Sequence, residues 1–109
     1  MLNSVQVCDI CRHLLLVKSS TLILCKAIDI DYFVKTLLEQ NEDLIFDKNS
    51  RILRNRKNNA RIRFVTSVSF TDLKSISPDN CFYVEDVDEK LLKAASIFKN
   101  VFCFRPLEF

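Results

Sequence analysis

The chain has 109 residues, a formal net charge of +2 and 49% hydrophobic residues, which is typical of a globular protein with one modest core. It contains no glycine, and the phosphate-binding loops of P-loop and Rossmann proteins need positive-φ conformations that glycine supplies. The composition therefore excludes both kinds of nucleotide site.

The first segment of the chain has apolar residues at helical spacing. It runs through residues 5–17 and predicts a helix there, although the β-branched start leaves a strand as an alternative. Residues 18–28 follow as a short turn and a second apolar element. Residues 29–44 have the strongest helical pattern, with Asp29 or Asp31 as the expected N-cap.

Strand patterns dominate the rest of the chain. Residues 44–54 predict a hairpin with its turn at 47–50, and residues 60–70 predict a strand because Ile62, Phe64 and Val68 alternate with polar residues. A buried strand at 81–87, a helix at 88–100 capped by Asp88 and a closing strand at 101–107 complete the series.

These elements predict an α+β fold. The order helix, short helix, helix, hairpin is that of a winged helix, so residues 1–60 are expected to form a winged-helix-like half whose hairpin is the wing. Residues 61–109 add a strand and a small β-α-β unit. We expect the two halves to pack as one compact domain.

Parts of this order resemble La-type RNA-binding proteins, which join a winged-helix La motif to an RNA-recognition motif (RRM). "VQVCDICRHLLLVKSST" (5–21) and "IDIDYFVKTLLEQNEDLIFDKNSRILRNR" (28–56) are similar to the later part of the La motif, and "FYVEDV" (82–87) fits the first RRM strand. The resemblance implies RNA binding. It does not extend to the aromatic segment that grips terminal uridines, which would lie before the first residue.

Positive charge is gathered in "RILRNRKNNARIR", residues 51–63, which has no acid. Guanidinium groups bind phosphate oxygens through bidentate hydrogen bonds, which predicts a nucleic-acid surface on the wing. An acidic protein partner and plain solvation are the alternatives. The predicted contacts are Arg51, Arg54, Arg56, Lys57, Arg61 and Arg63.

Tyr83 is a further candidate, because an aromatic side chain on the strand at 81–87 can stack on a base. The alternative, which we favour, is that it belongs to the core, since neighbouring residues of a strand point to opposite faces.

Metal binding and catalysis find little support. Cys8, Cys11 and His13 have partial zinc-ligand spacing, but no second paired motif supplies further ligands. The acids Asp86, Asp88 and Glu89 are expected to cap a helix. We therefore expect no metal, no cofactor, no catalytic residue and no small-molecule substrate.

The leading hypothesis is a non-catalytic RNA-binding module within a ribonucleoprotein. The alternative is a small structural or adaptor subunit that docks on a larger assembly through apolar strand edges, which the apolar segment 101–109 favours. Either way we expect a protein partner or a homodimer to cover exposed edges. Five cysteines and no secretory signal predict an intracellular protein, cytoplasmic or nuclear, without a membrane partner.

Overall fold

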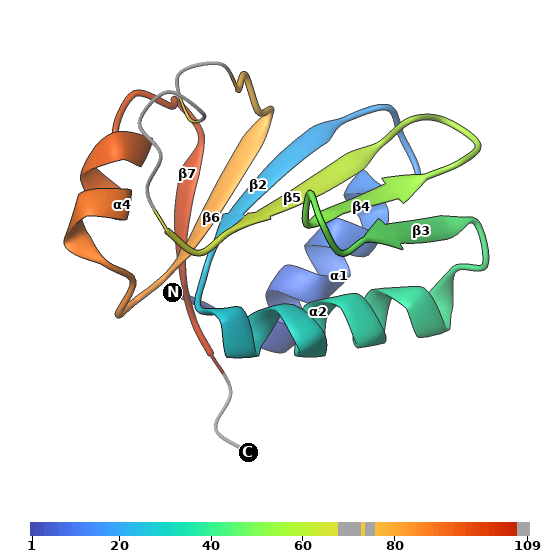
Figure 1. Cartoon of the computed structure of the whole chain (residues 1–109), viewed down its shortest axis with the longest axis horizontal. Coiled ribbons are helices and arrows are strands. Elements are labelled where there is room, and N and C mark those ends of the chain that lie inside the picture. Colours follow the sequence, from blue (N-terminus) through green and yellow to red (C-terminus); the bar gives the residue numbers. More distant parts are fainter. Residues whose placement is uncertain (68–72, 74–75, 107–109) are drawn as a thin grey trace.

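The computed structural model describes residues 1–67, 73 and 76–106, which form one seven-stranded mixed sheet in the order β1-β7-β6-β2-β5-β4-β3 (Figure 1). Strands from both halves of the chain therefore share a single sheet. In chain order the elements are β1 (Leu2–Asn3), α1 (Ser4–Leu14), β2 (Ser20–Leu24), α2 (Ala27–Gln40), β3 (Leu44–Asp47), β4 (Ile52–Asn55), β5 (Arg61–Val65), β6 (Asn80–Val84), α4 (Glu89–Ala95) and β7 (Val101–Arg105).

The sheet has a parallel part and an antiparallel part. Strands β1, β7, β6, β2 and β5 pair with one another in parallel, with Leu22 of β2 paired to Arg63 on one side and Cys81 on the other. Strands β3, β4 and β5 form an antiparallel meander. This meander makes the end of the sheet farthest from α4 (Figure 1).

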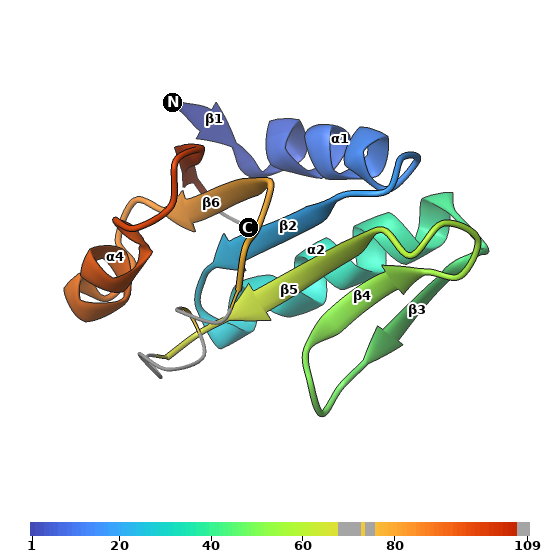
Figure 2. The same cartoon turned by 90° about the horizontal axis from the view of Figure 1, so that it is seen from above.

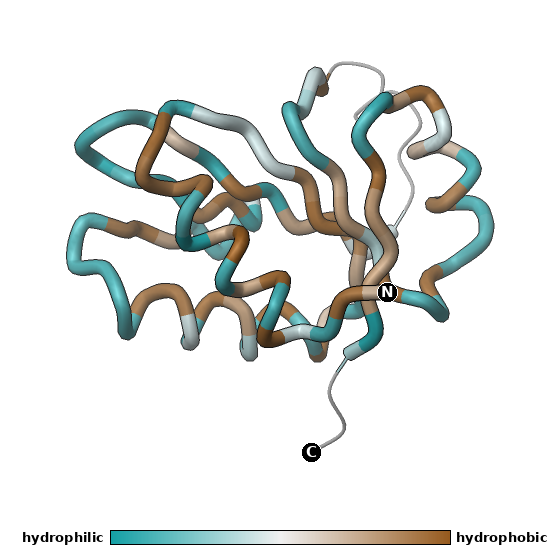
Figure 3. Tube along the Cα trace, turned by 180° about the vertical axis from the view of Figure 1, so that it is seen from behind, coloured by the Kyte–Doolittle hydropathy of each residue, from teal (hydrophilic) through white to brown (hydrophobic). Residues whose placement is uncertain are grey.

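Helices lie on both faces of the sheet (Figures 1 and 2). Helices α1 and α2 pack on one face, where Ile23 and Phe82 join their core, whereas α4 packs on the other face against Leu22 and Leu24. Alternation along each strand explains the division, because successive side chains point to opposite faces. Hydrophobic residues are accordingly concentrated along the central strands (Figure 3).

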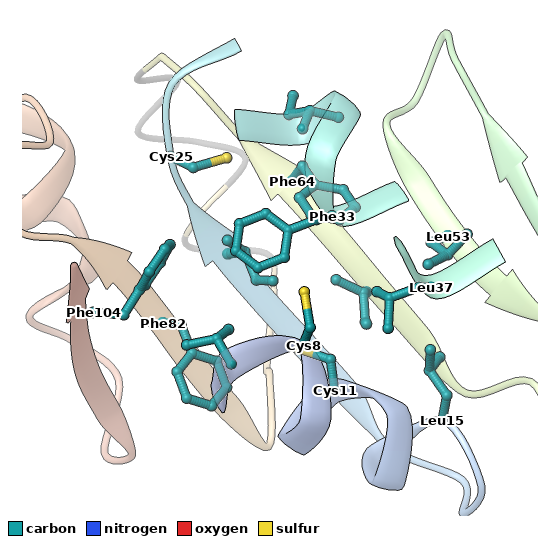
Figure 4. Close-up of a cluster of buried hydrophobic side chains, with 14 of the residues drawn as sticks. Cys8, Cys11, Leu15, Cys25, Phe33, Leu37, Leu53, Phe64, Phe82 and Phe104 are labelled. Carbon is teal, nitrogen blue, oxygen red and sulfur yellow. The ribbon is translucent and has the colours of Figure 1, made fainter. Parts of the chain in front are cut away.

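The larger core is rich in aromatic rings and thiols (Figure 4). The ring of Phe33 on α2 lies 6.2 Å from that of Phe64 and 5.6 Å from that of Phe104, centroid to centroid. Cys8 and Cys11 of α1 are buried beside it. This core holds α1 and α2 on one face of the sheet. The opposite face of the β3–β5 meander takes no part in it.

The α+β prediction is confirmed, as are the first helix, the hairpin β3–β4 and the parallel β6-α4-β7 unit. The winged-helix order of the first half is wrong, because residues 20–24 form the central strand β2 in place of a short helix. Four of its five residues are buried, so both faces lie inside the protein and the segment has no alternating pattern to mark it as a strand.

The expected cap of the second helix is also corrected. Helix α2 begins at Ala27 with Lys26 as the N-cap, and the Asp29 carboxylate accepts a hydrogen bond from the backbone N–H of Lys26. Asp88 caps α4 as predicted, accepting from the N–H of Lys90. Val68, expected in the strand at 60–70, lies outside the described residues.

Candidate nucleic-acid interface

Side chains of β4 and β5 alternate between the two faces of the sheet. Leu53 and Ile62 pair in register and are buried in the core under α2. On the opposite face Arg54 pairs with Arg61, and Ile52 pairs with Arg63. The β3 partners Ile45 and Asp47 extend this surface. We call it the arginine face: Ile45, Asp47, Ile52, Arg54, Arg61 and Arg63.

The arginine face is hollowed. A hollow of about 730 Å³ is lined by five of its residues together with Ser50, Asn59 and Lys18, the last from the turn between α1 and β2. A second hollow of about 300 Å³ shares Ile52 and Arg61 with the first and continues toward Arg63 and Ile76. The two hollows form a depression across the meander, with cationic side chains around it.

The arginines of this face form no close ion pair among the described residues, although the charge of Arg54 helps to lower the pKa of Asp47 on the same face. No carboxylate among the described residues lies within 4.0 Å of the guanidinium groups of Arg54, Arg61 or Arg63. Asp47, the acid on the arginine face, accepts hydrogen bonds from the N–H groups of Asn49 and Ser50. These bonds lower the pKa of Asp47, so its charge is used to hold the β3–β4 turn.

Arg56 and Lys57 lie elsewhere, in the turn between β4 and β5. The Lys57 ammonium is 3.3 Å from the Asp43 carboxylate, and the Arg56 guanidinium donates to the carbonyl of Glu42 at 3.3 Å. Both side chains therefore contact the junction of α2 and β3. These two residues, predicted from the sequence to contact nucleic acid, are therefore separate from the three arginines of the arginine face.

Two asparagines fix this turn to the body of the protein. The side-chain amide of buried Asn55 donates to the carbonyl of Leu15 at 2.7 Å, and that of Asn58 donates to the same carbonyl at 3.1 Å. The Asn55 side-chain oxygen also accepts from the N–H of Lys57. The β4–β5 turn is thus held against the end of α1.

Arg51 lies at the opposite end of β4. Its backbone is left-handed, with φ 56°, a conformation that costs a non-glycine residue about 1–2 kcal/mol. Its guanidinium donates to the hydroxyl of Thr66, and it lines a small hollow of about 170 Å³ together with Arg63. Arg51 is therefore placed at the margin of the arginine face.

Tyr83 is not on the arginine face. It lies on β6, and its side chain is on the same side of the sheet as the arginine face. Strand β2, however, separates β6 from β5. Its half-buried ring packs in the core under α4, and burial raises the pKa of its hydroxyl. The surroundings match the core alternative for this residue more closely than a base-stacking position.

Four of the five cysteines lie in the cores, and Cys103 is half-buried. Burial raises the pKa of Cys8, Cys25 and Cys81 from 9.0 to about 12 in each case, and it raises the pKa of Cys11 as well. No group of three or more metal-ligating side chains occurs in the described part of the chain. His13 is exposed to solvent, whereas Cys8 and Cys11, the two thiols of the same sequence motif, are buried.

Charged residues at the carboxyl ends of the parallel strands form a feature that the sequence interpretation missed. Asp86, expected to cap a helix, instead pairs with Lys26 after β2, and Glu85 pairs with Arg105 of β7 at 3.1 Å. Lys26 lowers the pKa of Asp86. These pairs join three adjacent parallel strands, and only the order of the strands, not the sequence, brings the partners together.

The chain is thus an α+β protein with helices on both faces of a mixed sheet and an arginine-lined depression on one part of it. Comparison with protein-family models, with curated proteins and with solved structures gives no match. No helix among the described residues is long and apolar enough to cross a membrane.

Proposed function

We propose that the chain is a non-catalytic RNA-binding module that contacts phosphates through the arginine face, as part of a ribonucleoprotein. The observation that carries this proposal is the direct cross-strand pairing of Arg54 with Arg61. Like charges opposite each other destabilise a sheet, and an anionic ligand would neutralise both. Arg63 and Lys18 extend the same positive surface, and Arg51 lies at its margin.

Fluorescence anisotropy with a labelled RNA at low salt tests the proposal. The double substitution Arg54→Gln and Arg61→Gln is compared with Lys35→Gln and Lys99→Gln, which removes the same charge from exposed positions elsewhere. We expect the arginine variant to lose at least about tenfold in affinity, since each phosphate contact contributes through charge and counterion release. Equal affinities for the two double variants would contradict a specific role of this face.

A second candidate, a structural subunit that docks through strand edges, rests on the β7 edge. Strand β1 pairs only with Phe104 and Arg105 of β7 among the described residues. The Phe102 side chain nearby is 46% exposed, with its ring 5.4 Å from that of Phe82. An exposed aromatic ring beside an incompletely paired strand favours a protein contact there.

A further inference from the structure

We infer that the arginine face binds single-stranded RNA by holding an unpaired base against its aliphatic floor; the inference rests on the proposed function. The floor is made by Ile45 and Ile52, which lie on the same face as the arginines. Ile45, on the edge strand β3 directly opposite Arg54, is 44% exposed. Phosphates do not bind aliphatic side chains, whereas the apolar faces of a base do.

The surroundings of this floor match a nucleotide. Arg54 and Arg61 flank the hollow from adjacent strands, and planar guanidinium groups can stack on bases as well as bind phosphates. Ser50 and Asn59 add hydrogen-bonding groups of the kind that recognise base edges. Lys18 provides a further cation for the adjoining phosphate.

The size of the hollow agrees with this occupant. The hollow of about 730 Å³ is open to solvent, so it has room for a base together with its phosphate and does not enclose either. In a duplex the bases are paired and stacked inside the helix, so they cannot reach an aliphatic floor between strands. The occupant that fits is therefore a single strand with unpaired bases.

Three labelled RNAs with equal numbers of phosphates separate base contacts from charge contacts: a uridine single strand, the same strand with abasic residues, and a blunt duplex. For the wild-type chain at low salt, we expect the uridine strand to bind at least about fourfold tighter than the abasic strand, the contribution expected when one apolar group is removed from water. The duplex should resemble the abasic strand.

Ile52→Ser tests the floor without changing charge. It should weaken binding of the uridine strand, leave binding of the abasic strand unchanged and leave the salt dependence unchanged. The matched control is Ile97→Ser, an exposed position beyond the end of α4. Circular dichroism checks that both variants fold; the comparison of the three RNAs by the wild-type chain needs neither variant.

Two results would overturn the inference in distinguishable ways. Equal binding of all three RNAs would show contacts to phosphate alone, and the proposed function would survive without the base site. Absence of binding to any RNA, with capture of an acidic protein in its place, would overturn the proposed function together with the inference.

Discussion

Arg54 and Arg61 lie directly opposite each other on neighbouring antiparallel strands, with no carboxylate within 4.0 Å of either among the described residues. Two like charges in register oppose the pairing of β4 with β5. The buried residues on the other face, Leu53 and Ile62, offset this repulsion. The two faces of one hairpin thus make opposite contributions to stability.

Replacing one member of this pair should separate stability from binding. Arg61→Thr removes the repulsion and introduces a residue that is favoured in strands, so we expect the free energy of unfolding to rise by about 0.2–1 kcal/mol. RNA affinity should fall in the same variant. Urea unfolding and fluorescence anisotropy measure the two effects, and a loss of stability would contradict the account of the pair.

The salt dependence of RNA binding should distinguish arginines by their position. Arg54→Glu should make the slope of log K against log salt shallower by about one unit per lost phosphate contact, equally for different RNA sequences. Arg56→Glu should have a smaller effect, because that side chain contacts the Glu42 carbonyl and does not line the hollow. Identical slopes for both variants would show that the arginine face has no special part in binding.

Stability should fall in alkaline solution because thiols are buried. In the folded chain the pKa of Cys8, Cys25 and Cys81 is raised from 9.0 to about 12. Above about pH 9 the unfolded chain releases thiol protons that the folded chain retains, so each thiol reduces stability by up to about 1.4 kcal/mol per pH unit until about pH 12. Below about pH 9, the pKa of a thiol in the unfolded chain, both states keep their thiol protons and this loss of stability does not occur.

Urea unfolding between about pH 8 and about pH 10.5 measures this slope. The variant Cys81→Ala removes one titrating thiol whose pKa is raised by burial, so its slope should be smaller by one proton than that of the wild type. A stability that is independent of pH across this interval would show that the thiols are accessible to water.

The β4–β5 turn depends on Asn55. Substitution Asn55→Ala removes a buried hydrogen bond to the Leu15 carbonyl and leaves the N–H of Lys57 without its side-chain acceptor. We expect a loss of about 1–3 kcal/mol in the free energy of unfolding. Asn58→Ala removes a donor to the same carbonyl and the acceptor of the Ala60 N–H, and it should cost less because the Asn58 side chain is only half-buried. If both variants lower the free energy of unfolding equally, the loss in Asn55→Ala is not caused by the burial of Asn55.

The β7 edge leads to a test of assembly. If Phe102 contacts a second copy of the chain, sedimentation velocity should show association that increases with concentration, and Phe102→Ser should abolish it. Ile97→Ser provides a control with another exposed apolar side chain. A wild-type chain that remains monomeric at high concentration would leave this edge to a different protein or to none.

Much of the fold could be predicted because its patterns are local. The helical spacing of residues 5–17 and the alternation around residues 44–54 each reflect one buried face. The strand at 20–24 could not be assigned in the same way, because it is buried on both faces and a short apolar run has no period. Its type is decided by pairing with β5 and β6, which are distant in the sequence.

The candidate site was predictable in part. Alternation places Arg61 and Arg63 on one face once Ile62 and Phe64 are assigned to the core. The sequence does not reveal that Arg56 and Lys57 contact residues 42–43, since those contacts depend on where α2 ends. Nor does it show that α4 lies over Tyr83, because the face taken by a crossover helix depends on the whole sheet.

The central position of β2 delays its pairing during folding. Both strands that flank β2 come much later in the sequence, so an apolar segment remains without strand partners until most of the chain is available. Such distant pairings carry a large loop-closure cost and slow folding. A nascent chain released early would expose this segment to aggregation, so folding yield should depend on completion of β6 more than on any residue of the arginine face.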